Sequence, residues 1–519
     1  MAAKANLDAL IPREDFEIGE STNLVTKKET ISIEDIKADS FFFPCIRKPD
    51  FQRQTNEWDS DKISKFITSF VEGDLIPAII LWRSTAGYLF VIDGSHRLSA
   101  LSAWVNNDYG DQSISKRFYD GEIPKEQIKV AQETRKLIEK NIGSYSDFKL
   151  ALTHPEKVKQ HTVRYAKNLA ALAIQLQWIE GDASKAESSF LNINQQASPI
   201  NKTELKLIQS RNKPNSIAAR AIFRSGKGHK YWSSFSDEIQ CEIQQIAKEI
   251  NKTLFEPKLE TPIKTLDIPI GGKIYSSDSL SLILDFVNVV NGIDVSNKTG
   301  EKADDKTGEE TIKILKNTRK FAYRLIGNHP SSLGLHPAVY VYSKSGRHKT
   351  AALLAIVDFV MELDKHQKIN DFIKVRDKFE DFLINYDYLS QQIYLKYKDV
   401  QKSYKPTSKF FQLMMSELIN NKPVDEILDK ILSQTEFKYL SVRKDQAETT
   451  FSQDFNTSQK SSIYIKQALQ DASRCGICNG LIHRNAISID HIQRKQDGGL
   501  ATLDNGQLTH PYCNTGYKN

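Results

Sequence analysis

The sequence predicts an α+β protein of several domains: an N-terminal α/β domain, a mainly helical middle and a small metal-stabilised domain at the C-terminus. The chain has 519 residues, which is too many for a single hydrophobic core. Apolar side chains recur at helical spacing over most of residues 230–440. Three of the five cysteines lie in the last 45 residues, in the spacing of a zinc site. We therefore expect three domains, at 1–215, 216–444 and 463–519, and a polar linker at 445–462.

Composition narrows the class of protein. The chain is 39% hydrophobic and 26% charged, as in ordinary soluble proteins. It has no apolar run of about eighteen residues, and its first residues lack the apolar core of a signal peptide. Few cysteines outside one cluster argue against a disulfide scaffold. We expect a cytoplasmic protein without a membrane partner.

The pattern of residues 50–105 predicts a helix, a hairpin, a loop and a second helix. Gly73 ends the first helical run. The second strand of the hairpin continues directly into a polar loop that begins with Asp93. The expected segments are a helix at 59–71, strands at 77–82 and 88–92, a loop at 93–97 and a helix at 98–105.

The rest of the chain gives coarser expectations. We expect an extended arm with a short helix near Ile33–Ala38 within residues 1–40, and alternating helices and strands over 124–178. The polar insert at 295–311 is expected to be a mobile loop. A short helix near 463–472 is expected to lead into the last domain.

Two pairs of zinc-binding residue types enclose an Asp-His pair near the C-terminus. The pairs are Cys475 with Cys478 and His510 with Cys513, about thirty residues apart, and this spacing predicts a structural zinc clamp. Between them lies Asp490-His491. A histidine can activate water and a divalent ion can hold a phosphate, so the arrangement points to phosphodiester cleavage.

The segment from Cys475 to Lys518 resembles the HNH endonuclease family, the ββα-metal nucleases. The resemblance implies that His491 is the general base and that Asn505 holds the loop and orients it. It implies that Asp490 and Asn514 bind the catalytic ion, Mg²⁺ or Mn²⁺, because carboxylate and amide oxygens suit hard ions. The alternative is a zinc ribbon that only binds DNA or protein. His483 matches no position of the motif and is expected on the surface.

A second motif follows the predicted hairpin of the first domain. Gln52-Arg53 and Trp58 precede it, and the motif itself is Asp93-Gly94-Ser95-His96-Arg97. Arginines can fork onto phosphate oxygens, and Gly94 permits a tight turn after a strand. Asp93 can hold a metal or orient a water, and His96 can bind phosphate or transfer a proton. The alternative is an Asp-Gly turn with Arg97 in a surface ion pair.

This motif resembles the ParB-like nucleotidase superfamily, in particular the DGQQR domains of modification-dependent (type IV) restriction enzymes and the DGQHR proteins. The resemblance extends over about residues 30–215 and includes Phe190-x-x-Ile193-Asn194 with Pro199 and Glu204. It implies a nucleoside triphosphate (NTP) as ligand, together with NTPase activity. The implied nucleotide-binding residues are Gln52, Arg53, Asp93, Gly94, His96 and Arg97.

A basic segment lies between the two motifs. Residues 202–230 carry eight Lys or Arg and one acid, a balance that suits contact with phosphates. We expect Thr203 to cap the helix that carries it; a solvated helix face is the alternative. The candidate DNA-binding residues are Lys206, Arg211, Lys213, Arg220 and Arg224.

A third segment looks like a phosphate-binding loop but lacks the required spacing. Two residues separate Gly346 from Lys349 where the P-loop motif has none. We expect a plain loop before a helix.

Together the motifs predict a nucleotide-regulated HNH endonuclease that cleaves foreign double-stranded DNA, with or without chemical modification, in bacterial defence. Its expected cofactors are structural Zn²⁺, catalytic Mg²⁺ or Mn²⁺ and an NTP. A second copy of the chain and a partner defence subunit are the two candidate protein partners. The alternatives are a ParB-like DNA-binding regulator with an inactive HNH unit, and an HNH protein that cuts RNA.

Overall fold

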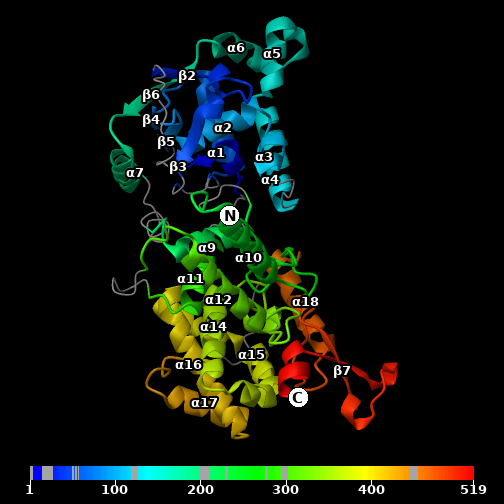
Figure 1. Ribbon diagram of the computed structural model, residues 1–519. Coiled ribbons are helices and arrows are strands. Elements are labelled where there is room, and N and C mark those ends of the chain that lie inside the picture. Colours follow the sequence, from blue (N-terminus) through cyan, green and yellow to red (C-terminus); the bar gives the residue numbers. More distant parts are fainter. Residues whose placement is uncertain are drawn as a thin grey trace. The chain divides into compact units, whose positions relative to one another are not determined.

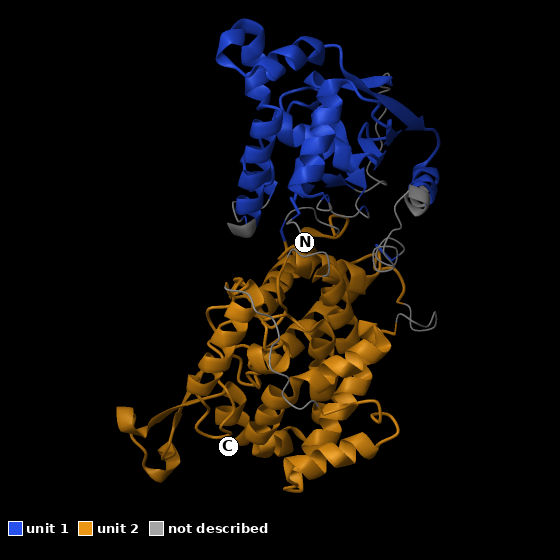
Figure 2. Ribbon diagram, turned by 180° about the vertical axis from the view of Figure 1, so that it is seen from behind, with its two compact units in different colours: residues 1–211, 227–231 blue, residues 212–226, 232–519 orange. Residues whose placement is uncertain are grey.

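The structure is a computed structural model of the chain. It describes residues 4–14, 27–49, 52, 55, 58–118, 123, 125–197, 210–227, 232–274, 279–294, 302–442 and 454–518. The chain divides into two compact units (Figure 2), residues 1–211 with 227–231 and residues 212–226 with 232–519. The helical middle and the C-terminal segment both fall in unit 2. The expected three-domain division stays a prediction.

Unit 1 is built on a six-stranded mixed sheet with the order β1-β3-β5-β4-β6-β2. The pairs β1–β3, β3–β5 and β4–β6 are parallel, whereas β4–β5 and β2–β6 are antiparallel. The expected hairpin is therefore confirmed as β4 and β5 at the centre of the sheet. The strands are β1 (Arg13–Glu14), β2 (Thr30–Ser32), β3 (Ile46–Pro49), β4 (Ile79–Arg83), β5 (Leu89–Asp93) and β6 (Ala173–Ile179).

Alternation along the central strands creates a core on each face of this sheet. Leu81 and Val91 belong to the larger core, which the helices α1, α2, α4 and α6 also build. Trp82 and Phe90 point to the opposite face, where Phe190 of α7 completes a smaller core. The helices are α1 (Ser60–Glu72), α2 (Ser95–Val105), α3 (Ser113–Phe118), α4 (Lys125–Asn141), α5 (Tyr145–Thr153), α6 (Gln160–Leu169) and α7 (Ala183–Ala197).

The predicted helix at 59–71 is confirmed with its capping signals. Asp59 accepts a hydrogen bond from the Lys62 amide at the N-terminus of α1, and Gly73 ends the helix at φ 80°. The next helix begins at Ser95, three residues earlier than expected. Gly94, at φ 98°, makes the turn from β5 into α2, so no loop separates them.

The expected N-terminal arm is wrong for the residues that the structure describes. Leu7, Leu10 and Ile11 are buried in the larger core, and β1 adds a parallel edge strand to β3. The short helix near residues 33–38 is confirmed as a single turn, Glu34–Ile36. The expected alternation of helices and strands over 124–178 is wrong: residues 125–169 are helical apart from short connections, and one strand, β6, follows them.

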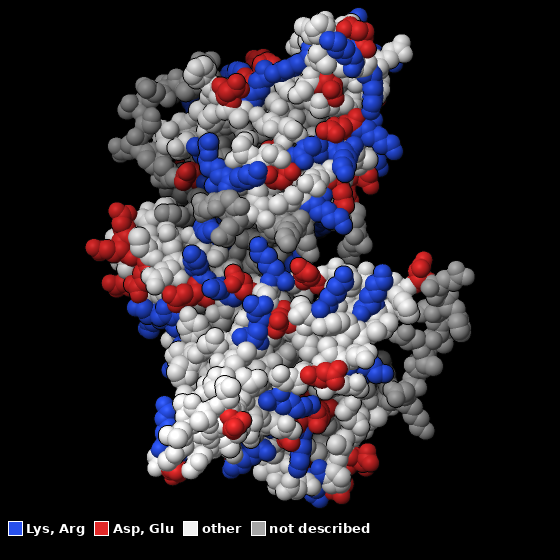
Figure 3. All heavy atoms as spheres, turned by 90° about the vertical axis from the view of Figure 1, so that its right-hand side faces the viewer, with Lys and Arg blue, Asp and Glu red and all other residues white. Residues whose placement is uncertain are grey.

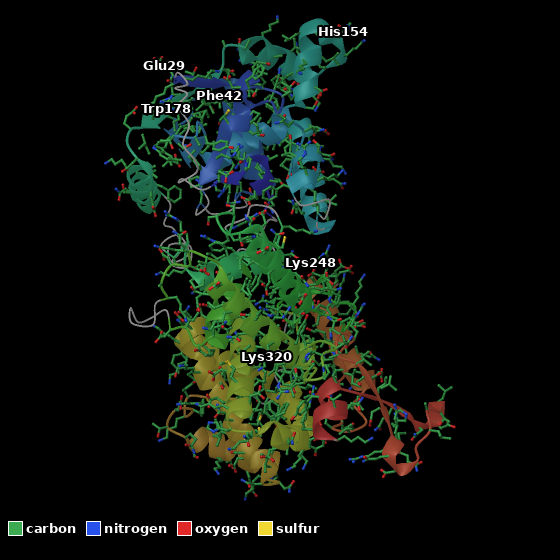
Figure 4. The ribbon with its side chains drawn as sticks, in the orientation of Figure 1. Glu29, Phe42, His154, Trp178, Lys248 and Lys320 are labelled. Atoms are coloured by element: carbon green, nitrogen blue, oxygen red, sulfur yellow. The ribbon has the colours of Figure 1, made fainter. Side chains whose placement is uncertain are left out.

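At the opposite edge of the sheet, the residues before β2 extend its pairing with β6. The Leu176 amide donates to the Glu29 carbonyl at 2.8 Å, and the Trp178 indole donates to the Lys28 carbonyl at 2.7 Å. Figure 4 shows Glu29, Phe42 and Trp178 gathered on one side of unit 1. These contacts pin β2 and β6 together.

Unit 2 is mainly helical, as expected for residues 230–440 (Figure 1). The helix α14 (Thr350–Lys365) is its central element, because an unbroken run from Ala351 to Val357 is buried. It packs against α11, α15 and α16, while α9 packs against α10, α11 and α12. The other helices are α9 (Pro214–Phe223), α10 (Asp237–Phe255), α11 (Ser279–Val290), α12 (Glu309–Leu325), α13 (Pro337–Tyr340), α15 (Ile369–Tyr397), α16 (Val400–Ile419), α17 (Val424–Ser433) and α18 (Thr457–Asp471).

Three expectations about connections have different outcomes. The loop before Thr350 is confirmed, since residues 342–349 form a turn that leads into α14. In the insert, residues 295–301 lie outside the described residues, and α12 already begins at Glu309. The helix before the last domain is confirmed but starts at Thr457, six residues earlier than expected.

The C-terminal segment adds a hairpin and a turn to unit 2. The strands β7 (Ser488–His491) and β8 (Gly506–Thr509) pair antiparallel, and Cys513–Tyr517 forms one π-helical turn after them. Figure 1 shows β7 and the segment after it projecting beyond the helices. None of the helices in the described part of the chain has the length and apolar character that a membrane crossing requires.

Candidate active site and metal centre

The two predicted zinc pairs come together as one buried cluster. Ligand atoms of Cys475, Cys478, His510 and Cys513 all lie within 4.8 Å of one another, and all four side chains are buried. The Nδ1 atom of His510 lies 3.4 Å from Cys478 Sγ and 3.8 Å from Cys513 Sγ. Three sulfurs and one imidazole nitrogen fit the tetrahedral structural zinc site that the sequence predicts.

Hydrogen bonds from neighbouring groups favour the forms of His510 and Cys475 that bind a metal. The His510 Nε2 pairs with the Leu481 carbonyl at 3.0 Å, which places the proton on Nε2 and leaves Nδ1 for a metal. Hydrogen bonds from the Cys478 and Cys513 thiols lower the pKa of Cys475, because they stabilise its thiolate. Thiolate is the form of cysteine that binds zinc.

A buried ion pair of α15 attaches the cluster to the helices. The Arg376 guanidinium lies 2.7 Å from Glu380 and 3.2 Å from His510 Nδ1, and both ion-pair side chains have no exposed surface. It also donates to the carbonyls of Leu333 at 2.5 Å and Gly334 at 3.0 Å. The cluster is therefore anchored on α15 by charge-assisted hydrogen bonds.

Glu380 and a glycine complete this attachment from the other side. The second Glu380 oxygen accepts the Leu481 amide at 2.7 Å, within the cysteine-bearing loop. A Cβ added at Gly480 would lie 2.6 Å from Arg376 Nε, so only glycine permits this approach. No local pattern in the sequence pointed to either contact, because the partners lie a hundred or more residues apart.

The hairpin carries the Asp-His pair of the predicted catalytic site. Asp490 lies on β7 opposite Gln507 of β8, and His491 lies opposite Gly506. The Gln507 amide donates to Asp490 Oδ2 at 2.9 Å. Burial of Asp490 and this cross-strand bond fix the carboxylate on the hairpin.

His491 has the features expected of a proton acceptor. Its Nε2 is buried and makes no hydrogen bond to any group that the structure describes. A buried imidazole nitrogen without a partner is costly unless a ligand or water completes it. An unpaired Nε2 is consistent with a ligand or water that binds next to His491.

Asn505 braces the loop that follows His491. Its side-chain oxygen accepts the Gln493 amide at 2.7 Å, and its nitrogen donates to the carbonyls of Gln493 at 3.1 Å and Leu500 at 2.8 Å. Its backbone carbonyl accepts the Ile492 amide at 2.9 Å. These contacts support the loop-holding role that the HNH resemblance implies.

The donor set beside His491 fits a hard divalent ion. Asp490 offers a carboxylate, and the Asn514 amide nitrogen donates to Ser488 Oγ at 2.8 Å and to the Ile489 carbonyl at 3.2 Å. Of the two polar side-chain atoms of Asn514, the oxygen is the one that can bind a cation. Carboxylate and amide oxygens are ligands that Mg²⁺ and Mn²⁺ accept.

Two features of this region were missed or misjudged from the sequence. Lys518 donates to Asp490 Oδ2 at 2.7 Å and to the His491 carbonyl, although no spacing rule pointed to it. The expectation that His483 lies on the surface is wrong: its side chain has no exposed area. It packs edge-on against His336, with ring centroids 5.4 Å apart, and burial lowers its pKa to about 4.

The N-terminal motif gathers at the end of β5. The Gln52 side chain donates to the Val91 carbonyl at 3.3 Å. Arg97 donates to Asp93 at 2.7 Å and to the Ala78 carbonyl at 3.1 Å. Arg53 lies outside the described residues. The Asp93–Arg97 ion pair is what the alternative interpretation, an Asp-Gly turn with an ion pair, expects. Both groups nevertheless lie at the carboxyl end of a sheet strand, where ligands commonly bind.

His96 and Gly94 occupy the first turn of α2. The His96 ring stacks on Trp58 at 5.7 Å between centroids. Gly94 is required here because its φ is 98° and an added Cβ would lie 3.0 Å from Ile79. In the extended motif, Phe190 is buried and Ile193 packs beside it; the side chain of Asn194 and residues Pro199, Thr203 and Glu204 are outside the described part.

The candidate DNA-binding residues do not form one exposed stripe among the described residues. Arg220 and Arg224 are buried in and just after α9. Arg211 pairs with Glu187 at 2.7 Å, and Lys213 donates to the Lys302 carbonyl at 2.7 Å. Lys206 is not described. On the face that Figure 3 shows, Lys and Arg are interspersed with Asp and Glu. Their contact with DNA stays a prediction.

Comparisons with known proteins match both ends of the chain. Residues 31–210 match the model of the GmrSD restriction endonuclease N-terminal domain, and residues 475–519 match the model of the HNH endonuclease. No curated protein and no solved structure matches the chain significantly. The chain thus carries a GmrSD N-terminal domain and a C-terminal HNH domain, which support a restriction endonuclease with DNA as its substrate.

Proposed function

We propose that the protein is a metal-dependent DNA endonuclease of bacterial defence. In this proposal the HNH domain cuts foreign DNA, with or without chemical modification. The N-terminal domain binds an NTP through its ParB-like motif and governs the cutting.

The observation that carries the proposal is the setting of His491. Its Nε2 is buried and lacks a hydrogen-bond partner among the described groups, and the Asp490 carboxylate precedes it on the same strand. A neutral imidazole in this position can accept the proton of a water that attacks a phosphodiester. A zinc ribbon that only bound DNA would have no need for this pair.

The ion site would supply the other half of the chemistry. Asp490 and Asn514 would hold Mg²⁺ or Mn²⁺, which stabilises the charge that develops on the phosphate and the leaving oxygen. Asn505 would keep the loop in place so that His491 stays oriented. Zinc, held by Cys475, Cys478, His510 and Cys513, would only stabilise the fold.

The regulatory part rests on the motif at the end of β5. Asp93, His96 and Arg97 lie in or just before the first turn of α2, whose backbone amides favour an anion. A triphosphate would compete for Arg97, which now pairs with Asp93. That exchange would give the domain two states, one with nucleotide and one without.

A plasmid-cleavage assay tests the nuclease. We expect cutting with Mg²⁺ or Mn²⁺ that His491→Ala abolishes, while His366→Ala, which removes an exposed histidine of the same unit, cuts as the wild type does. Cutting that survives His491→Ala would overturn the assignment. DNA binding without cutting in either ion would instead favour the regulator with an inactive HNH unit, and cutting of RNA alone would favour the third alternative.

The same assay with unmodified and modified phage DNA, with and without NTP, tests regulation. We expect Asp93→Ala and Arg97→Ala to weaken nucleotide binding and to change cutting. Glu133→Ala, on the exposed side of α4, is the control. If both motif variants bind nucleotide and cut normally, the regulatory proposal fails and the nuclease proposal stands.

A further inference from the structure

A lysine reaches into the candidate ion site from the turn after the zinc cluster. The Lys518 ammonium lies 2.7 Å from Asp490 Oδ2, and the side chains of this ion pair are only 16% and 7% exposed. The ammonium also donates to the His491 carbonyl. A cation of the protein therefore sits on the carboxylate that is proposed to bind the catalytic ion.

The backbone holds Lys518 in this place from two sides. Its amide donates to the carbonyl of the zinc-site residue Cys513 at 3.1 Å. Its own carbonyl accepts a hydrogen bond from the Arg494 guanidinium at 2.6 Å. Because both contacts fix the main chain, the lysine is placed by the fold of the domain.

The contacting pair has no net charge. Asp490 contributes one negative charge and Lys518 one positive charge, and the Asn514 amide contributes none. Divalent ions in phosphate-processing sites are held by one or two carboxylates together with the phosphate of the substrate. Here the protein offers one carboxylate and cancels it with its own cation.

We propose that Lys518 keeps the ion affinity of the DNA-free protein low, so that the catalytic ion binds tightly only together with a DNA phosphate. The inference rests on the proposed function, since it concerns the same site. The DNA phosphate adds the negative charge that Lys518 neutralises in the DNA-free protein. The ammonium can then contact both the Asp490 carboxylate and the phosphate. Metal loading thereby becomes coupled to DNA binding.

A purely structural role for Lys518 predicts the opposite sign. If the lysine only oriented Asp490, its removal would weaken ion binding. If charge dominates, its removal strengthens binding, because an ion on either oxygen of Asp490 lies close to the ammonium and is repelled by it. For a divalent ion we expect roughly tenfold tighter binding or more without the lysine.

The experiment measures Mn²⁺ binding to the zinc-loaded full chain by the electron paramagnetic resonance signal of free Mn²⁺. Lys518→Met removes the charge and the hydrogen bonds, and Lys518→Gln removes the charge but keeps an amide donor. Lys518→Arg keeps the charge. Lys466→Met, at an exposed position of α18, removes one charge elsewhere. Zinc content checks that each variant is folded.

Without DNA we expect both neutral variants to bind Mn²⁺ more tightly than the wild type, and Lys518→Arg and Lys466→Met to match the wild type. Adding Asp490→Asn to Lys518→Gln should remove the gain, which locates it at this carboxylate. In a His491→Ala background, duplex DNA should strengthen Mn²⁺ binding strongly with Lys518 present and weakly with Gln.

Unchanged or weaker Mn²⁺ binding in the folded neutral variant would overturn the inference. The cleavage assay judges the proposed function separately. A protein that cuts through His491 but shows no Lys518 effect keeps its function and loses this inference. A protein that shows the Lys518 effect but never cuts loses the nuclease proposal while the ion site remains.

Discussion

Removing Arg376 is expected to destabilise unit 2 strongly and to loosen its zinc. The guanidinium makes three hydrogen bonds, to Glu380 and the carbonyls of Leu333 and Gly334, and it lies 3.2 Å from the His510 Nδ1 that would bind zinc. In Arg376→Met the Glu380 carboxylate stays buried with only neutral donors. Breaking a fully buried ion pair in this way typically costs about 3–5 kcal/mol.

The loss is smaller when both charges are removed. Glu380 also accepts hydrogen bonds from the Tyr340 hydroxyl at 2.9 Å and the Leu481 amide at 2.7 Å, so these donors become unpaired when it is replaced. We expect Arg376→Met with Glu380→Met to recover part of the lost stability but not all of it. The contribution of this ion pair to the free energy of unfolding therefore depends on these neutral hydrogen bonds as well as on its two charges.

The assay follows zinc release with a colorimetric chelator during urea unfolding. The control is Lys374→Met on the same helix, because Lys374 pairs with Asp371 while both side chains are largely exposed. That change should cost less than about 1 kcal/mol. If Arg376→Met lowers the zinc-release midpoint no more than Lys374→Met does, the zinc cluster is not anchored on α15 as the contacts indicate.

Three further predictions concern other parts of the chain. Burial holds the pKa of His483 at about 4, below its unfolded value of about 6.5, so neutral His483 favours the folded state above pH 6.5 and unit 2 loses about 3 kcal/mol of unfolding free energy as the pH falls to 4. His483→Gln should therefore make the urea midpoint less dependent on pH over that window. An unchanged pH dependence would contradict the burial argument. Gly94→Ala forces a side chain to φ 98° within 3.0 Å of Ile79 and should lower the unfolding free energy of unit 1 by about 1–2 kcal/mol, read from tryptophan fluorescence; a neutral effect would mean that the turn relaxes. Asn505→Ala should reduce cleavage about tenfold or more at normal zinc content, and normal cleavage would show that the loop does not position His491.

The sequence predicted the parts of the structure that depend on neighbours along the chain. Cys475 and Cys478 share one loop, and His510 and Cys513 share another, so their spacing alone revealed the cluster. The first helix carried its own cap at Asp59 and its own stop at Gly73. Local signals of this kind do not depend on contacts with the rest of the fold.

The parts that could not be predicted depend on contacts between distant segments. Arg376 meets His510 across 134 residues, and a lysine or arginine at helical spacing gives no sign of burial. The basic segment shows the same effect, since Arg220 and Arg224 were predicted to belong to a DNA-binding stripe but are buried in and just after α9. Leu7 and Ile11 belong to a short segment with no helical or strand periodicity, yet both pack in the larger core of unit 1.

The candidate zinc cluster and the proposed ion site share one turn of chain, so a change at one is expected to affect the other. Cys513 belongs to the zinc cluster, Asn514 lies next to it as a candidate ligand of the catalytic ion, and Lys518 closes the same turn by its amide bond to Cys513. Asp490, on β7, is tied to that turn through Lys518. Loss of zinc is expected to release Cys513 and to weaken the turn that carries Asn514 and Lys518. Under the proposed function, zinc would therefore support catalysis indirectly, by holding this turn beside β7.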